Sequence, residues 1–566
     1  MPAPDATSLV VGITGHRDLP PADVPAIKAQ VRAFFLDLAD RYPHLPVVVL
    51  SSLAEGGDQI AAQVALDLGL RVIAPLPLPV ALYREDFGSA GGLVAFEQHL
   101  QRAEILELPL RHGIDIEAAA QHGPARDRQY AQAGIFVSSH CHVLLALWDG
   151  RKSDRLGGTA QVVRFHLQGE LPGAIERRRD TTLALLGLDE ETIVHHLPVR
   201  RGTSEIAPTL EGRWLTAKDE VVAHSAMPET FDRMFRRQME FNADCRKYAE
   251  AMATDRAAPE TANATPFVCP IHRLFATADW LARIYQQRVN RVLRIVYLLA
   301  AAMGFTFFLY THIATHYLII NLFLVFFLGG MGVVLVSRRR EWQRKYLDYR
   351  ALAEGLRVQS YWRRAGISDL HSPAFAHDNF MHRQDSELGW IRNVMRSASL
   401  EGLLVPVVAG EAEIDAVIGE WIGNSSGEGQ LAYFAAATSR RERMHRRAEV
   451  AGLWCLWAGV GISAVLAVFS RWFQPNLQHM LVSSMGILSV AGGVHEAYAY
   501  KKADKELIKQ YHYMQRIFGA ARRRLAGCRN VHEKRQVLRT LGEAALAEHA
   551  EWTLMHRERP LEHSRL

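Results

Sequence analysis

Two long apolar runs without a charged residue constrain this chain more than any other feature: Ile295–Thr311 and Tyr317–Ser337. A bilayer core of about 30 Å is crossed by roughly 17–25 helical residues, and both runs reach that length. Residues 312–316 are all that separates them. The pattern predicts two transmembrane helices joined by a short loop. The alternative, a pair of buried core helices, is disfavoured because neither run holds a charge.

A second pair of apolar segments follows, at Ala448–Ser470 and His479–Tyr500, with residues 471–476 between them. The last segment is the least apolar of the four. The sequence therefore predicts an all-α membrane domain with four transmembrane helices in two hairpins.

Basic residues flank the four segments on one side only. Cytoplasmic loops carry an excess of Lys and Arg, so we expect both termini in the cytosol and both hairpin tips outside. The N-terminus lacks the pattern of a signal peptide, which agrees with a cytosolic first domain. The two short inter-helix loops hold only Arg471, whereas the flanks hold Arg288, Arg291, Arg294, Arg338, Arg339, Arg340, Arg440, Arg441, Arg443, Arg446, Arg447, Lys501 and Lys502.

The two predicted hairpins resemble a duplication. Phe275–Ala278 (FATA) precedes the first hairpin and Phe434–Ala437 (FAAA) precedes the second, at an offset of 159 residues. The same offset carries Arg288 onto Arg447. A charged helical stretch with aromatic residues follows each hairpin, so we expect an internal repeat.

The N-terminal part alternates apolar runs with helical patterns. Continuous apolar runs suit strands that are buried on both faces of a parallel sheet, and the alternation predicts an α/β Rossmann-like domain. The predicted strands are Leu9–Ile13, Pro46–Leu50, Val72–Leu76, His142–Trp148 and Ile193–Leu197, and the predicted helices are Ala22–Asp40, Gly57–Leu68 and Gln129–Ser139.

Glycine-rich and charged loops follow the predicted strands. Ligands of such sheets bind beyond the carboxyl ends of the strands, where glycines let backbone N–H groups approach a phosphate. The alternative is that these glycines only make tight turns, but loops of this kind follow four strands. The candidate ligand-binding residues are Gly12, Thr14, Gly15, His16, Arg17, Glu55, Gly56, Gly57, Asp58, Arg84, Asp149, Gly157, Gly158 and Thr159.

These loops resemble the SLOG superfamily, which includes "lonely guy" phosphoribohydrolases, DNA-processing protein A and nucleotide-sensing domains of bacterial conflict systems. The resemblance covers about residues 8–200 and implies a bound nucleotide or nucleotide-derived signal, without a cofactor. By residue match, Gly15–Arg17, Gly56, Gly57 and Gly157–Thr159 would line that site. The matching strings are GITGHRDL, SSLAEGGDQIAA, PLPLPVALYREDF and LWDG…GGTAQVV.

The membrane part is similar to SLATT-type effectors, in which cytosolic helices surround a transmembrane hairpin. The similarity is carried by this architecture and by Arg283–Arg288 (RIYQQR). Four helices in place of two depart from the pattern, which a duplication would explain. The resemblance implies an oligomeric effector or ion channel of bacterial antiviral defence, in the inner (cytoplasmic) membrane, whose partners are a nucleotide messenger or metabolite and the lipid bilayer.

A membrane-anchored N-glycoside hydrolase remains the alternative function. The hydrolases of the superfamily carry a glutamate soon after GGxGT, but here Thr159 is followed by Ala160–Val163, without a carboxylate. Glu55 or Asp58 is a possible substitute, although such acids more often hold a ribose hydroxyl or cap a helix. We therefore assign no catalytic residue.

The remaining features add few constraints. The net charge of +5 over 566 residues does not indicate nucleic-acid binding, and the five cysteines form no C-x-x-C pair. We expect no metal site at His140–His142 (HCH), because alternation in a strand separates the two histidines from the cysteine. The expected organisation is a nucleotide-binding domain at 1–210, a linker and helices at 211–294, hairpins at 295–337 and 448–500, and cytosolic helices at 338–447 and 501–566.

Overall fold

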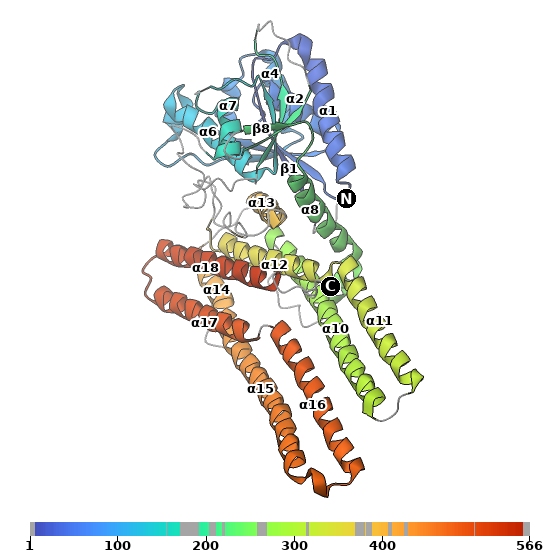
Figure 1. Ribbon diagram of the computed structural model, residues 1–566. Helices are drawn as coiled ribbons and strands as arrows, with labels where there is room; N and C mark the ends of the chain where they lie inside the picture. Colours follow the sequence, from blue (N-terminus) through green and yellow to red (C-terminus); the bar gives the residue numbers. More distant parts are fainter. Residues whose placement is uncertain are drawn as a thin grey trace. The chain divides into compact units, whose positions relative to one another are not determined.

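A computed structural model of the chain (Figure 1) describes residues 6–153, 155–169, 192–202, 211–217, 221–256, 269–312, 316–367, 380, 388–405, 410–423, 428–502 and 504–557. The chain divides into two compact units. The first contains Met1–Thr277 and Gly355–Val408, and the second contains Ala278–Glu354 and Ala409–Leu566. Residues 257–268, within the predicted linker and helices at 211–294, lie outside the described residues.

The first unit is built on one eight-stranded sheet with the order β4-β3-β2-β1-β5-β6-β7-β8. Strands β4 to β6 are parallel, and β7 and β8 pair antiparallel at one edge. The five predicted strands are confirmed, with ends shifted by one or two residues. The strands are β1 (Leu9–Gly15), β2 (Val47–Leu50), β3 (Arg71–Leu76), β4 (Glu104–Glu107), β5 (Val143–Trp148), β6 (Ile193–Pro198), β7 (Arg213–Ala217) and β8 (Val221–His224).

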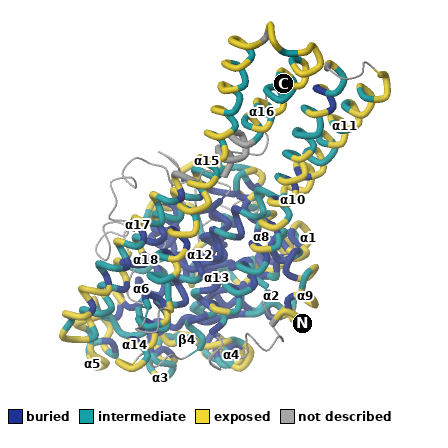
Figure 2. The backbone as a smooth tube through the Cα atoms, turned by 90° about the horizontal axis from the view of Figure 1, so that it is seen from below, coloured by how far each residue is buried: buried dark blue, intermediate teal, exposed yellow. Residues whose placement is uncertain are grey.

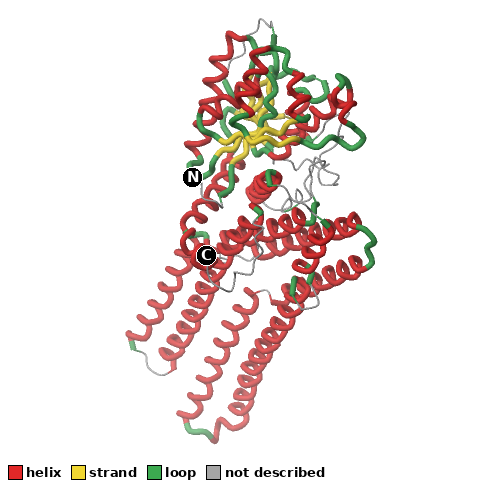
Figure 3. Tube along the Cα trace, turned by 180° about the vertical axis from the view of Figure 1, so that it is seen from behind, coloured by secondary structure: helices red, strands yellow, loops and turns green. Residues whose placement is uncertain are grey.

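Helices cover both faces of this sheet (Figure 3). Alternate residues of β1 point to opposite faces, so Leu9 and Val11 pack with α1 (Val24–Arg41) and α2 (Gly57–Asp67), whereas Val10 packs with α6 (Pro124–His140) and α7 (Thr159–Gln168). The domain is therefore a doubly wound α/β fold with a mixed sheet, as the Rossmann-like prediction requires in its parallel part.

Two later helices complete the first unit. Within the predicted linker and helices at 211–294, the chain forms α8 (Glu229–Lys247) and α9 (Ala249–Arg256). Helix α13 (Gly389–Leu403) packs near the sheet, where Asn393 O lies 2.9 Å from Nε2 of His142. Residues from beyond the first two apolar segments thus belong to the α/β unit, so the predicted region 338–447 contributes to both units.

Within the part of the chain that the structure describes, four helices are long and apolar enough to cross a membrane, which confirms the four predicted apolar segments. The candidate spans lie in α10 (Pro270–His312), α11 (Tyr317–Arg339), α15 (Gln430–Phe469) and α16 (Pro475–Lys502). Their surfaces are mostly exposed or half-buried (Figure 2), and the exposed side chains include Leu328, Trp454 and Trp457. Apolar side chains exposed along four helices indicate a membrane protein.

The apolar helices also contact one another. Phe307 of α10 and Phe323 of α11 have ring centroids 6.2 Å apart, and α15 packs along α16. Outside the apolar part, Lys534 of α18 (Val531–Arg557) binds Glu411 and Asp415 of α14 (Glu411–Trp421) at 3.2 and 2.8 Å. These ion pairs and the packing of α17 (Asp504–Ala526) on α15 and α18 hold the second unit together.

Candidate functional site

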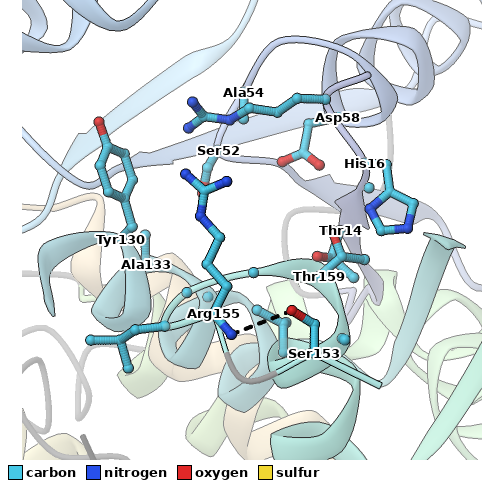
Figure 4. A pocket seen from close by; sticks show the side chains of 18 of the residues that line it. Thr14, His16, Ser52, Ala54, Asp58, Tyr130, Ala133, Ser153, Arg155 and Thr159 are labelled. Carbon is cyan, nitrogen blue, oxygen red and sulfur yellow. Dashed lines mark hydrogen bonds between the residues drawn. The ribbon is translucent and has the colours of Figure 1, made fainter. Parts of the chain in front are cut away.

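A large cleft opens at the carboxyl ends of β1 and β5, with a volume of about 1110 Å³. From β1 the chain continues to β2 on one side, and β5 leads to β6 on the other side, so this is the topological switch point of the sheet. Doubly wound sheets bind ligands at this place, because the loops after the two central strands separate there. Figure 4 shows side chains from these loops around the cleft.

His16 and Asp149 tie the two central strand ends together. Nε2 of His16 lies 3.0 Å from Oδ1 and 3.1 Å from the amide nitrogen of Asp149. Burial by itself would raise the pKa of Asp149, but hydrogen bonds from the Arg151 N–H and from His16 hold the pKa below its usual value. Asp149 is therefore a carboxylate at neutral pH, fixed at the rim of the cleft.

The N-terminus of α7 faces the cleft without a side-chain cap. Its N-cap is Gly158, and the preceding Gly157 has a φ of +73° that favours glycine. Thr159 and Ala160 line the cleft, and neither backbone N–H donates to an acceptor within the described part of the chain. Free donors at a helix N-terminus, together with the helix dipole, form a site for an anion.

Seven Lys and Arg residues line the same cleft, and three of them, Arg126, Arg200 and Arg201, are paired with carboxylates. The other four are Arg17, Arg151, Lys152 and Arg155. None of them makes an ion pair with a carboxylate among the residues that the structure describes. Figure 4 shows Arg155 extending between Tyr130 and Asp58. Uncompensated cations beside free amide donors favour a ligand with more than one negative charge.

Other arginines at the cleft are already neutralised. Arg126 is 2% exposed, and its Nη2 lies 2.9 Å from Asp86 while its Nη1 donates to the carbonyls of Ala119 and Ala120. Arg200 likewise pairs with Asp23. These two arginines therefore hold the walls of the cleft, and the four free cations remain for a ligand.

One buried carboxylate, Asp58, lies in the first turn of α2 and is 7% exposed. Burial raises its pKa to about 7, although the Arg17 charge and a hydrogen bond from the Gly15 N–H oppose the shift. Asp58 can thus gain or lose a proton near neutral pH. Placed beside Arg17, it can accept from a ribose hydroxyl or exchange a proton with a bound molecule.

We expect Asp58→Asn to remove a pH dependence of stability. The folded-state pKa of about 7 exceeds the usual 3.8, so between these values the folded chain keeps a proton that the unfolded chain has released. The free energy of unfolding of the native protein therefore falls as pH rises through this window, by at most about 1.4 kcal/mol per unit. The gain of Asp58→Asn in thermal midpoint should be larger at pH 8 than at pH 5.

The exposed carboxylate Asp127, which also lines the cleft, provides the control for this measurement. Thermal unfolding of the full chain in detergent is compared for Asp58→Asn and Asp127→Asn at both pH values. Equal pH slopes for the two variants and the native protein would show that Asp58 is not buried as an acid.

The structure brings nine of the fourteen predicted ligand residues to the cleft. These are Thr14, Gly15, His16, Arg17, Asp58, Asp149, Gly157, Gly158 and Thr159.

The other five lie elsewhere and have packing roles. Gly12 faces Cys141 and Val137 inside the sheet, while Gly56 and Gly57 pack closely against the backbone of residues 15–17. Glu55 accepts from the Gly88 N–H and the Ser89 hydroxyl, and Arg84 pairs with Glu97.

Several residues that line the cleft were not predicted from the sequence, chiefly Tyr130, Arg126 and the basic group of Arg151, Lys152 and Arg155. The basic group follows Trp148-Asp149-Gly150 directly, so its charge was a signal available in the sequence. Tyr130 comes from α6, the helix before β5, and only the helix packing brings it to this edge. Its ring lies 5.6 Å from the Arg17 guanidinium carbon.

The His140–His142 segment has a structural role. Nδ1 of His140 lies 2.9 Å from the Phe136 carbonyl, and His142 bridges Val10 N and Asn393 O. Burial lowers the pKa of His142 to about 3, so this histidine stays neutral. No group of three or more possible metal ligands occurs among the described residues.

No known family matches this chain. No curated protein matches its sequence either. The function must therefore be inferred from the cleft and from the four apolar helices.

Proposed function

We propose that this chain is a membrane effector in which a nucleotide or nucleotide-derived signal binds the cleft of the α/β unit and controls the membrane helices. The observation that carries the proposal is the uncapped N-terminus of α7 beside four unpaired cations, at the switch point of a doubly wound sheet. The same chain contains four candidate membrane spans.

The chemistry of the cleft supports a nucleotide. The amides of Thr159 and Ala160 suit one phosphate, and Arg17 and Arg155 supply charge for a second. Asp58 and Asp149 offer acceptors for ribose hydroxyls, and Tyr130 offers an aromatic face for a base. The volume of about 1110 Å³ lies at the upper end of small-molecule sites, so a dinucleotide would also fit.

The membrane part supports an effector. In this proposal the four helices form two hairpins in a bacterial inner membrane, with both termini in the cytosol, and the bound signal changes their packing or assembly so that ions pass. The resemblances to SLOG sensors and SLATT effectors support the same arrangement in antiviral defence or stress signalling.

Nucleotide affinity should depend on the cleft cations. Arg17→Ala and Arg155→Ala each remove a charge-assisted contact worth about 1.5–3 kcal/mol, which corresponds to a loss of roughly tenfold to a hundredfold in affinity. Native mass spectrometry of the purified protein identifies a co-bound nucleotide, and calorimetry with that nucleotide measures the affinity.

Arg84→Ala is the matched control, because Arg84 was predicted from the sequence but pairs with Glu97 and does not line the cleft. Its affinity should equal that of the native protein. If Arg17→Ala and Arg155→Ala bind as tightly as Arg84→Ala, with folding intact, the proposed site is wrong.

The proposed topology makes a labelling prediction. A cysteine in place of Asn476, at the start of α16, should react with a membrane-impermeant maleimide in intact cells. A cysteine in place of the exposed Gln101, in the α/β unit, should react only after lysis. Labelling of both positions only after lysis would contradict the proposed orientation.

A second function, N-glycoside hydrolysis of a nucleotide, is favoured by one observation. The pKa of Asp58, at about 7, is that of an acid–base catalyst at neutral pH. Against it, the residues that follow Thr159, from Ala160 to Val163, include no carboxylate, and Oε1 of Gln161 accepts from the Gly157 N–H. Release of free base from the bound nucleotide, abolished by Asp58→Asn, would establish this alternative.

A further inference from the structure

The offset of 159 residues relates three helices of the membrane unit to three others. It carries α10 onto α15, α11 onto α16, and α12 (Trp342–Arg364) onto α17, with helix ends that agree to within a few residues. Each repeat therefore has a first span, α10 or α15, and a second span, α11 or α16. The unit holds two copies of one structural element.

One seam joins the two repeats inside the chain: the first span of repeat one packs on the second span of repeat two. A Cβ placed on Gly304 of α10 would overlap Val490 of α16, and the ring of Phe308 lies 3.5 Å from a Cβ placed on Gly486. Large side chains thus fit against glycines on both helices, which is the close packing that joins helices in lipid.

The offset gives the equivalent positions on the other two spans. Gly304 and Phe308 correspond to Ser463 and Ala467 of α15, and Val490 and Gly486 correspond to Met331 and Phe327 of α11. In the internal seam each helix supplies one small and one large residue, whereas at the equivalent positions both small residues lie on α15 and both large ones lie on α11. Phe327 and Met331 are 42% and 38% exposed, and Ala467 is exposed. Ser463 is half-buried at the edge of this face, and its hydroxyl lies 3.6 Å from Sδ of Met485 on α16.

These two faces do not meet within one chain. Helices α16 and α10 lie between α15 and α11 in both Figure 1 and Figure 3. The four helices thus lie in the order α15, α16, α10, α11. The outer helices α15 and α11 each carry one of the two faces that an equivalent seam would need, and neither face has a partner helix in the described part of the same chain.

We propose that α15 of one copy packs against α11 of the next copy, through Ser463 and Ala467 against Met331 and Phe327. A contact between a first span and a second span then occurs within each chain, as α10 on α16, and between neighbouring chains, as α15 on α11. Because different surfaces of each copy take part, the contact is head-to-tail, the type that generates a ring where the rotation between copies closes. The occupant is a second copy of this chain because the internal seam provides the template and the side-chain sizes at the four positions are complementary.

Cysteine cross-linking in native membranes tests this contact. Full-length chains with Met331→Cys and one affinity tag are co-expressed with chains carrying Ser463→Cys and another tag. Both chains have Cys455 and Cys528 replaced by serine. Oxidation with copper phenanthroline should shift the protein to a disulfide-linked dimer that carries both tags. Chains with both substitutions should form a ladder that extends beyond the dimer.

Phe327→Cys with Ala467→Cys provides a second pair if one substitution harms folding, which gel filtration in detergent reports. Val325→Cys with Val465→Cys is the control, because these residues lie two positions away, at nearly the same depth but about 200° around each helix. Both are exposed, at 61% and 41%. The control should give no more dimer than either single cysteine.

Three results would overturn the proposal. If lipid covers these faces, neither test pair forms a dimer in folded, membrane-inserted protein. If α15 and α11 close within one chain, the doubly substituted protein links internally and keeps the mass of a monomer. If copies meet at random, the control pair links as strongly as the test pairs.

Discussion

Liposomes that hold the purified chain should remain tight until the bound nucleotide is supplied, and should then release their contents. A switch that moves from 1% to 99% open raises leakage by about a hundredfold. Liposomes that hold the Gly158→Val variant should retain their contents with and without nucleotide. A Cβ at residue 158 would lie 3.1 Å from the Arg155 carbonyl, so a valine there must displace the loop before α7. Dye release measured against nucleotide concentration checks both expectations.

Gly91→Val serves as the control in the same assay. Gly91 lies in the first turn of α4 (Ala90–Leu100) and does not line the cleft, and nothing lies within 4 Å of its Cβ position. This variant should leak as the native protein does. Saturated binding with leakage at baseline would contradict the effector proposal. Turnover of the nucleotide under those conditions would favour the hydrolase instead.

The energetics of such a switch call for several sites. Moving from 1% to 99% open requires the ligand to favour the open form by about 5.5 kcal/mol. Allosteric couplings are commonly about 1–3 kcal/mol for one site. A ring of copies, each with its own cleft, would supply the difference, and four spans in one chain are too few to enclose a wide pore. The proposed contact between α15 and α11 is therefore consistent with the gating proposal, although its test does not depend on a nucleotide.

The parts of the fold that follow from local sequence were predicted correctly. The composition of a segment alone indicates its environment for buried strands such as Val47–Leu50 and for long uncharged runs such as Tyr317–Ser337. Strand β4 was missed because its sequence, EILE, is polar at both ends and lies exposed at the sheet edge. Its pairing depends on β3, which a local pattern does not reveal.

Long-range contacts account for most of what the sequence did not indicate. Helix α13 reaches the first unit through contacts between residues more than 200 positions apart, such as His142 with Asn393. Periodicity identifies such a helix but not its partner. The pairing of the four spans into two hairpins remains a prediction for the same reason.

The two glycines in the loop after β2, Gly56 and Gly57, show why a glycine motif alone does not identify a ligand site. A phosphate loop and a tight backbone crossing both require glycine, so Gly56 and Gly57 were predicted as ligand residues. In the structure they lie behind the cleft: the Gly57 N–H donates to the His16 carbonyl at 2.9 Å. Glycines 157 and 158, in the equivalent place after β5, do line the cleft.

Gly56→Val should prevent the α/β unit from folding. Gly56 has φ +93° and ψ −124°, a region that is closed to β-branched residues. A Cβ there would also overlap the Arg17 carbonyl and lie 2.5 Å from the His16 carbonyl and 2.7 Å from the Arg17 Cα. Backbone strain of about 1–3 kcal/mol adds to a steric cost of similar size or larger, because backbone atoms cannot rotate away. The sum approaches the total stability of about 5–15 kcal/mol of a domain.

Gly69→Val separates the two contributions. Gly69 follows the same helix α2 and also has a positive φ, +72°, but nothing lies within 4 Å of its Cβ position. This variant should show the strain alone, as a modest fall in thermal midpoint with nucleotide binding retained. Gly56→Val should instead lose the cooperative unfolding transition of the α/β unit, followed by circular dichroism and protease resistance of the full chain. Equal midpoints for the two variants would mean that residues 16 and 17, which follow β1 and line the cleft, do not pack on Gly56. The described geometry of this side of the cleft would then be wrong.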